Sequence, residues 1–343
     1  HRHDVDAPAF EANGGHPGRQ HLPHALDHLE EVVGPVDLVH LAGVAVAHHH
    51  GGAVHRPGHL ALLAHDLFAL VLGHEVGVVQ ALGLFEHPMP DKKYQTTVRS
   101  REHLELARQA VRESLVLLKN ENEVLPLSKH TPTIFIAGEG ANDIGLQSGG
   151  WTLDWEGRPG NDNEGTTIFS GIKAVAGADT RMEFHREGDF SEFKDSEGKP
   201  LVADVGIVVI AEQPYAEGLG DSADISLSEA EEKLISEMRK QSKTVIVILL
   251  SGRPRLITEQ LSLAEAWVAA WLPGTEGAGI ADVLFGDYPF KGKLSYSWPR
   301  SEDQLPININ NIGDKIGCDA PLFPFGYGLA YGDPSPEILE CNP

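Results

Sequence analysis

The stretch from Asp204 to Asp221 constrains the fold more than any other, because it joins a buried strand to an acidic loop. Its first part, 205–211, is an unbroken apolar run dominated by β-branched residues, which is typical of a strand buried on both faces of a parallel sheet. The polarity then changes abruptly, and Glu212, Tyr215 and Glu217 follow within a few residues. Open α/β sheets bind ligands at the carboxyl ends of their strands, so this loop is a candidate site. The alternative is a solvated acidic loop without chemistry.

The chain after residue 83 alternates predicted strands and helices. Ser100 is expected to cap a helix that starts at Arg101, and Ser228 and Glu231 form a capping-box pair that starts another. The apolar face of the first helix has three- and four-residue steps and comprises Leu104, Ala107, Val111, Leu115 and Leu118. The other predicted elements are strands at 133–137, 205–211, 244–250 and 266–272 and a helix at 276–285. This alternation predicts an α/β fold with a mostly parallel sheet and helices on both faces, an α/β sandwich.

Residues 1–82 differ in composition from the rest of the chain. Up to residue 90 the sequence has no Lys, Ile, Ser, Thr, Tyr, Trp or Cys, and it holds most of the 18 histidines. Because helix caps and core aromatics are scarce there, we expect a poorly structured His/Ala/Gly-rich segment. We hypothesise that this segment is a wrong-frame or wrong-strand translation of GC-rich DNA rather than a genuine reading frame.

The histidines of this segment offer patterns that resemble metal sites. The run 48–50 is three adjacent histidines, His1 and His3 form an HxH pair, and His74 precedes Glu75. Ligands at successive positions do not share a helix face. The HxH pair follows no apolar strand, and His74 lacks the second histidine four positions later that a zinc-protease helix needs. We therefore predict weak adventitious metal affinity but no specific metal site, and no cofactor.

Charge and cysteine content narrow the classes of partner. The net charge of −23 argues against a nucleic-acid partner and against an anionic membrane surface, since both would repel an acidic protein. No apolar stretch is long enough to span a bilayer. Cys318 and Cys341 can form one bridge, which leaves the redox compartment open. The chain begins at His1 with no visible signal peptide, so we expect a processed chain, a truncated one or a fragment.

A glycine-rich loop with two tryptophans follows the first predicted strand. Gly138, Gly140 and Gly145 suggest a dinucleotide-binding turn, but the third glycine comes too late for GxGxxG. Trp151 and Trp155 then lie four residues apart among glycines and polar residues. Such rings either anchor a core or offer flat faces to the apolar sides of a sugar. The polar neighbours favour at least one exposed ring.

Six ordered blocks of the chain carry a family resemblance. They lie at 83–88, 107–120, 142–155, 212–221, 271–277 and 323–329, and they include GGWTLDW at 149–155 and EQPYAEGLGD at 212–221. Together they resemble the C-terminal part of family three glycoside hydrolases, the β-glucosidase and exo-β-glucanase type, from about Gly83 to Tyr331. The resemblance implies a linker at 83–99, an α/β sandwich domain at 100–300 and a tail at 301–343, with 1–82 unassigned.

The resemblance also implies roles for residues of the two loops. The acid/base glutamate of the family falls on Glu217, with Glu212 as the second choice. The sugar-stacking tryptophan falls on Trp155, with Trp151 second, and Tyr215 completes the expected substrate-binding set. A retaining glycosidase needs a protonated carboxyl group beside the leaving oxygen and a second carboxylate roughly 5–5.5 Å from it.

That second carboxylate, the nucleophile, is expected to be absent from this chain. In the family it is an aspartate on a (β/α) barrel that precedes the sandwich domain, and such a barrel needs roughly 250 residues, whereas the segment 1–82 stands in its place. The resemblance thus implies a barrel domain supplied elsewhere, β-linked glucosides or oligosaccharides as substrates, and a chain that is inactive alone. It is compatible with a periplasmic or extracellular protein.

Two functions of other classes remain open from the residues alone. One is a non-catalytic carbohydrate-binding or scaffold module that uses Trp151 and Trp155 without turnover. The other is a Rossmann-like nucleotide binder, which the glycine spacing disfavours.

Overall fold

The computed structural model describes residues 80–312, 315–339 and 341. The chain divides into two units, His1–Pro90 and Asp91–Pro343. The histidine patterns at His1 and His3, at 48–50 and at His74 lie outside the described residues, as does the predicted poorly structured segment up to residue 79.

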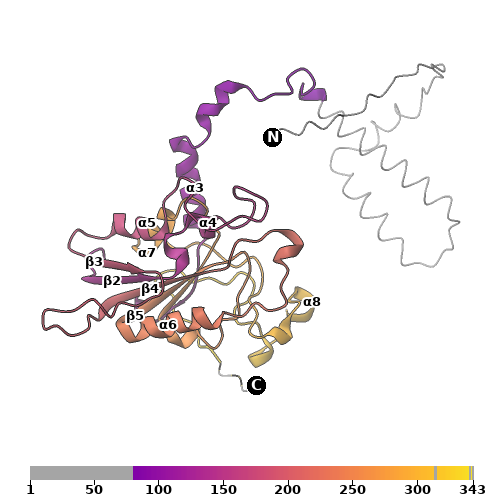
Figure 1. The fold of residues 1–343 in the computed structure, drawn as a ribbon. Coiled ribbons are helices and arrows are strands. Elements are labelled where there is room, and N and C mark those ends of the chain that lie inside the picture. Colours follow the sequence, from indigo (N-terminus) through magenta and orange to yellow (C-terminus); the bar gives the residue numbers. More distant parts are fainter. Residues whose placement is uncertain (1–79, 313–314, 340, 342–343) are drawn as a thin grey trace, which may run out of the picture. The chain divides into compact units, whose positions relative to one another are not determined.

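A six-stranded sheet forms the centre of the second unit (Figure 1). Across the sheet the strands are β1 (Val116–Asn120), β6 (Ala266–Trp271), β5 (Ser242–Leu250), β4 (Ala203–Ala211), β2 (Thr133–Ala137) and β3 (Arg181–His185). β1 is antiparallel to β6, and all other neighbouring pairs are parallel. The predicted mostly parallel sheet is confirmed.

Helices cover both faces of this sheet, as predicted. α5 (Ile168–Val175) and α7 (Ala278–Leu284) lie on one face with the end of α3 (Arg101–Ser114), and α6 (Glu229–Gln241) lies on the other (Figure 1). The remaining helical segments are short: η2 (Lys92–Thr97), η3 (Glu121–Glu123), η4 (Glu139–Asn142), α4 (Ile144–Ser148), η5 (Glu217–Gly220), η6 (Leu261–Leu263), η7 (Glu302–Gln304), α8 (Ile309–Ile312) and η8 (Gly317–Asp319).

The central strand β4 shows why an unbroken apolar run is needed. Ile207 and Val209 join the core on the side of α5 and α7, whereas Val208 and Ile210 join the core on the side of α6. Successive side chains of a strand point to opposite faces, so a strand covered on both sides needs apolar residues at every position. Each fully buried aliphatic side chain contributes about 1.5–3 kcal/mol to folding.

The two predicted helix caps are present. The Ser100 side chain accepts a hydrogen bond from the backbone N–H of His103 at 3.3 Å. Ser228 and Glu231 form a complete capping box at the start of α6. Each such cap contributes typically about 1 kcal/mol.

The predicted length of the first helix is wrong. α3 ends at Ser114, and Leu118 lies in β1 rather than on the helix. The run 115–118 is fully buried and pairs with β6 at the edge of the sheet, so pairing overrides helical spacing there. Of the predicted apolar face, the part that lies within α3 is mostly uncovered, since Val111 is buried but Leu104 is only half-buried and Ala107 is exposed.

An ion cluster fastens α3 to α7. Arg108 and Arg112 on α3 both bind Asp282 on α7, each with an N–O distance of 2.5 Å. The Asp282 side chain is only 6% exposed. Burial opposes ionisation of Asp282, but the hydrogen bonds from the two arginines outweigh it and lower the pKa of the carboxyl.

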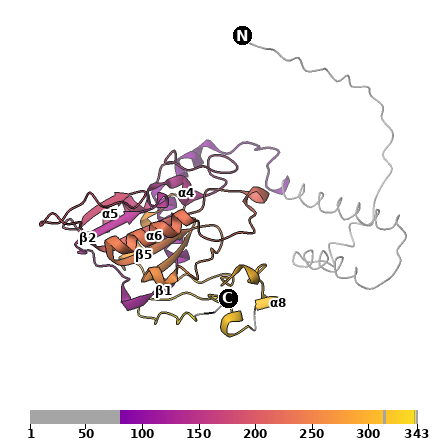
Figure 2. The same ribbon diagram turned by 60° about the horizontal axis from the view of Figure 1, so that its bottom comes forward.

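The C-terminal segment packs on the α6 face, where Trp298 and Phe323 join the core. In the turned view of Figure 2, α6 lies in front of the strands of the sheet. A disulfide joins Cys318 to Cys341, so the one bridge that the sequence allows is formed. No helix in the described ranges is long and apolar enough to cross a membrane.

Candidate active site

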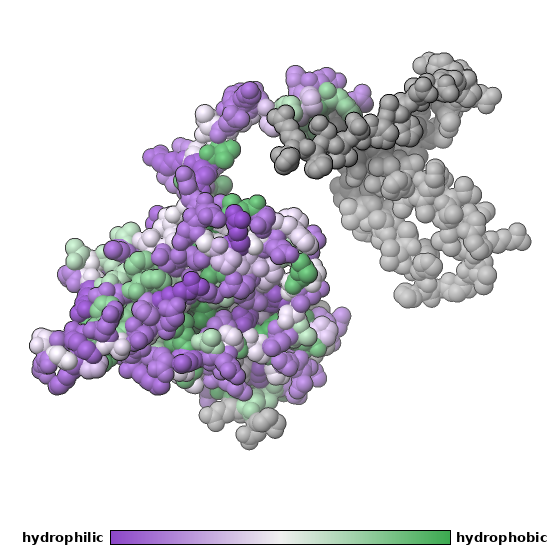
Figure 3. Space-filling model, viewed as in Figure 1, coloured by the Kyte–Doolittle hydropathy of each residue, from purple (hydrophilic) through white to green (hydrophobic). Residues whose placement is uncertain are grey.

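A crevice of about 890 Å³ opens at the carboxyl ends of β2, β4 and β5, beside the first turn of α6. The chain leads from β2 outward to β3 and then returns to β4 on the other side of β2. Ligands of open α/β sheets bind at such a reversal of strand order. The face of the second unit that Figure 3 shows is mostly hydrophilic. The acidic loop 212–221 forms part of the wall, so its predicted place at the end of a buried strand is observed.

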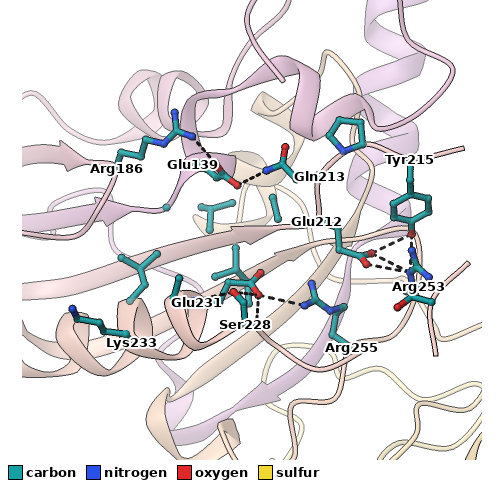
Figure 4. A pocket seen from close by; sticks show the side chains of 18 of the residues that line it. Glu139, Arg186, Glu212, Gln213, Tyr215, Ser228, Glu231, Lys233, Arg253 and Arg255 are labelled. Atoms are coloured by element: carbon teal, nitrogen blue, oxygen red, sulfur yellow. Dashed lines mark hydrogen bonds and ion pairs between the residues drawn. The ribbon is translucent and has the colours of Figure 1, made fainter. Parts of the chain in front are cut away.

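Paired side chains line the walls of this crevice (Figure 4). Glu139 accepts hydrogen bonds from Arg186 at 2.5 Å and from Gln213 at 2.7 Å. Glu212 lies with Tyr215 and Arg253, and Glu231 lies with Ser228 and Arg255. Most charges on the walls are therefore already neutralised by a partner.

Glu212 is the centre of a closed network. The Ser251 hydroxyl lies 2.6 Å from Glu212 Oε2, and the Tyr215 hydroxyl donates to the same oxygen at 3.1 Å. The Arg253 guanidinium lies 3.1 Å from Glu212 Oε1 and donates to Tyr215 Oη at 3.1 Å. It also stacks over the Tyr215 ring, 4.2 Å from its centre. Burial raises the pKa of Tyr215, and the neighbouring Glu212 carboxylate raises it further.

Glu217 has a different environment. It begins η5 and adopts a left-handed backbone with φ of 48°, which costs a residue other than glycine or asparagine about 1 kcal/mol or more. Its side chain is exposed and does not line the crevice. Within the described residues, no hydrogen bond or ion pair holds its carboxyl group. The carboxyl is thus free to meet a ligand that approaches from outside.

Both predicted tryptophans are exposed, Trp151 at 68% and Trp155 at 43%. The backbone N–H of Trp151 donates to the carbonyl of Trp155 at 3.0 Å, which closes the loop between them. Trp151 and Leu153 both have positive φ, so the loop is held in a conformation that presents its rings outward. The prediction that at least one ring is exposed is confirmed.

The tryptophan loop packs directly against the loop of Glu217. A Cβ added to Gly150 would lie 2.0 Å from the Tyr215 carbonyl oxygen, and one added to Gly149 would meet Leu272 at 2.7 Å. Only glycine permits such close approach. The loop of the two tryptophans and the loop of Glu217 therefore lie side by side, at the ends of β2 and β4, and the first of them also contacts the end of β6.

Gly138 serves the packing of the sheet rather than a phosphate. Its φ is 97°, and a Cβ there would lie 2.1 Å from the Val209 carbonyl oxygen of β4. The following helix α4 has only five residues, whereas a dinucleotide-binding turn opens onto a full helix. The nucleotide-binding alternative loses its structural basis here.

Comparison with known families decides the affiliation. The chain matches the Glycosyl hydrolase family 3 C-terminal domain over residues 115–331. The chain belongs to glycosyl hydrolase family 3.

Family 3 relatives agree over the same region. The chain is 33% identical over 278 residues to the lysosomal beta glucosidase of Dictyostelium discoideum, covering 76% of this chain and 34% of that protein. It is 29% identical to the periplasmic beta-glucosidase of Salmonella typhimurium, covering 75% of this chain and 39% of that protein. The chain thus spans about a third to two fifths of the curated relatives that it matches.

Solved family 3 structures share the fold. The exo-1,3/1,4-beta-glucanase from a Pseudoalteromonas species is 37% identical with a TM-score of 0.63, over 73% of this chain and 31% of that chain. The beta-glucosidase from Listeria innocua, solved in complex with isofagomine, is 27% identical with a TM-score of 0.60, over 75% of this chain and 38% of that chain. The resemblance predicted from the six blocks is confirmed.

Nearby aspartates of this family 3 domain are engaged in local structure. Asp143 is buried and accepts from the backbone N–H groups of Leu146 and Gly160 at 2.9 and 2.8 Å. Asp154 accepts from the backbone N–H of Gly157 at 2.7 Å. These bonds fix both side chains as turn and helix caps, and they leave Asp221 as the exposed carboxyl nearest in sequence to Glu217.

Sequence reasoning missed the partners that Glu212 finds on the neighbouring strand. Ser251 and Arg253 follow the strand that was predicted at 244–250. The parallel register pairs Ala211 with Leu250, which places Glu212 beside the residues that follow β5. A pairing of these two strands would have been the signal. Within the described residues, no group of three or more His, Cys, Asp or Glu side chains could hold a metal ion.

Proposed function

We propose that this chain is the acid/base half of a retaining β-glucosidase-like site. Glu217 donates a proton to the leaving oxygen, and Trp155 and Trp151 stack on the sugar rings of a β-linked glucoside or oligosaccharide. The observation that carries the proposal is the pairing of an unengaged, exposed carboxyl with two exposed indole rings on loops that pack together. A proton donor beside flat apolar surfaces is what a glycosidase needs on the leaving-group side.

The nucleophile comes from a barrel domain that is not part of the sandwich domain. A retaining mechanism needs a carboxylate on the opposite face of the sugar from the acid. Glu212 is held by Ser251, Tyr215 and Arg253, and Asp143 and Asp154 serve as caps. Asp221 is exposed but lies on the same loop as Glu217, on the leaving-group side. The curated relatives extend well beyond the matched region, which leaves room in them for a further domain. We expect the exposed Trp151, Trp155 and Glu217 to face that domain.

Turnover of an aryl β-glucoside by the purified chain tests this proposal. We expect no hydrolysis above a Glu217→Ala control, because the chain holds the acid but no nucleophile. Turnover well above this control would show that the chain contains a nucleophile and would overturn the proposed division of roles.

A non-catalytic carbohydrate-binding module is the second candidate. The exposure of both tryptophans favours it as much as it favours the enzyme. Binding of laminari- or cello-oligosaccharides should weaken in Trp155→Ala under either function. If Glu217→Gln leaves turnover unchanged once a barrel is joined to the domain, the binding module is the better description.

A further inference from the structure

We infer that Glu212 is a positioning residue: through Tyr215 it holds the turn that presents Glu217. Glu212 follows β4 directly, and its backbone N–H donates to Leu250 O at 3.0 Å, so its own position is fixed by the sheet. Its side chain is 18% exposed and contacts Ser251, Tyr215 and Arg253. In all of these contacts the carboxylate accepts, whereas a general acid must donate a proton.

Tyr215 links the Glu212 network to the turn at residues 216–220. Its hydroxyl donates to Glu212 and accepts from Arg253, which fixes the far end of the ring. A Cβ on Gly220 would lie 2.4 Å from the ring, and one on Gly252 would lie 2.7 Å from its hydroxyl oxygen. The residues 216–220 therefore fold around the Tyr215 side chain, and Ala216 and Gly220 on either side of the apex are buried.

The position of Glu217 depends on the Tyr215 side chain, because no hydrogen bond or ion pair within the described residues holds the Glu217 carboxyl itself. It sits at the apex with a left-handed backbone, which persists only where surrounding structure imposes it. The same Tyr215 carbonyl packs on Gly150 of the tryptophan loop. Loss of the Glu212 contacts should thus loosen the acid and shift it relative to the tryptophans. The effect of this support on catalysis rests on the proposed function, whereas the structural support of the Glu217 loop by Glu212 does not.

Hydrogen exchange of the full 343-residue chain, followed by mass spectrometry, tests the inference. In Glu212→Ala we expect peptides within 212–222 to exchange roughly tenfold faster, the effect of losing a hydrogen bond, with β4 and β5 unchanged. Tyr215→Phe should give the same local pattern. Glu212→Gln should restore much of the protection, because its carboxamide oxygen still accepts from Ser251 and Tyr215. Glu187→Gln, on the same crevice, is the matched control.

The outcomes separate positioning from a merely structural role. Faster exchange confined to 212–222, with rescue by Gln and none in the control, supports the inference. Unchanged exchange of this loop in Glu212→Ala, or a rise spread equally over β4 and β5, overturns it. Hydrogen exchange needs no turnover, so this test is independent of the acid role of Glu217. If the loop exchanges faster in Glu212→Ala but Glu217 proves dispensable for turnover, the proposed function is wrong and the positioning role of Glu212 stands.

Discussion

Replacement of Asp282 by alanine should destabilise the sandwich domain strongly. The Asp282 carboxylate is 6% exposed and accepts from Arg108 at 2.7 and 2.5 Å and from Arg112 at 2.6 Å. Removing one partner of a buried ion cluster costs about 3–5 kcal/mol. Here the two arginine side chains remain 35% and 28% exposed, so water can solvate them afterwards. We therefore expect a loss of about 2–4 kcal/mol in the free energy of unfolding.

Thermal and urea unfolding measure this loss. At about 2–4 °C per kcal/mol for a domain of this size, the melting temperature should fall by about 5–15 °C. The matched control is Asp287→Ala, because Asp287 pairs with Lys129 at 2.7 Å in an exposed ion pair, which should contribute less than about 1 kcal/mol. A loss in Asp282→Ala no larger than in this control would refute the assignment of Asp282 as the anchor of α3.

Three further predictions follow from the same contacts and from the sequence. The stability advantage of the wild type over Asp282→Asn should be fully present above about pH 4 and decline as the pH falls through the lowered pKa of the folded carboxyl; urea unfolding at pH 5, 4 and 3 checks this, and an advantage that grows towards pH 3 would contradict it. Glu217→Gln should change the free energy of unfolding by less than about 1 kcal/mol, since the side chain is exposed. Calorimetry checks this, and a large loss of stability would mean that Glu217 has a structural role. Limited proteolysis should remove residues before about Gly83 and leave a resistant core, as the composition of that segment suggests; equal protection of both parts would argue for a genuine folded N-terminal domain.

The parallel sheet could be predicted because burial on both faces leaves a plain signal. β4, β6 and the second half of β5 are apolar at nearly every position, and turn residues follow each of these strands. β3 was missed because it is an edge strand with the sequence RMEFH and only partial burial. α5 was missed although Thr167 caps it, since eight residues give little periodicity to detect.

The extra length predicted for α3 shows how local spacing can mislead. Leu115 and Leu118 continue the helical steps of Val111, yet both are fully buried beyond the helix, and Leu118 lies in β1, which pairs with β6 about 150 residues later. Helical propensity is a weak signal that tertiary pairing overrides. The same limit applies to the site, because the partners of Glu212 come from the neighbouring strand and are invisible to any local pattern.

The role of Glu217 can be tested in a chimera that joins this sandwich domain to a barrel domain of the kind that the family resemblance implies. Rates are compared for an activated aryl β-glucoside and for a glucoside with a poor leaving group. We expect Glu217→Gln to lower the rate by about 10²–10⁴-fold for the poor leaving group and far less for the activated one, since the latter scarcely needs protonation. If Glu212→Gln shows this dependence and Glu217→Gln does not, Glu217 is not the acid.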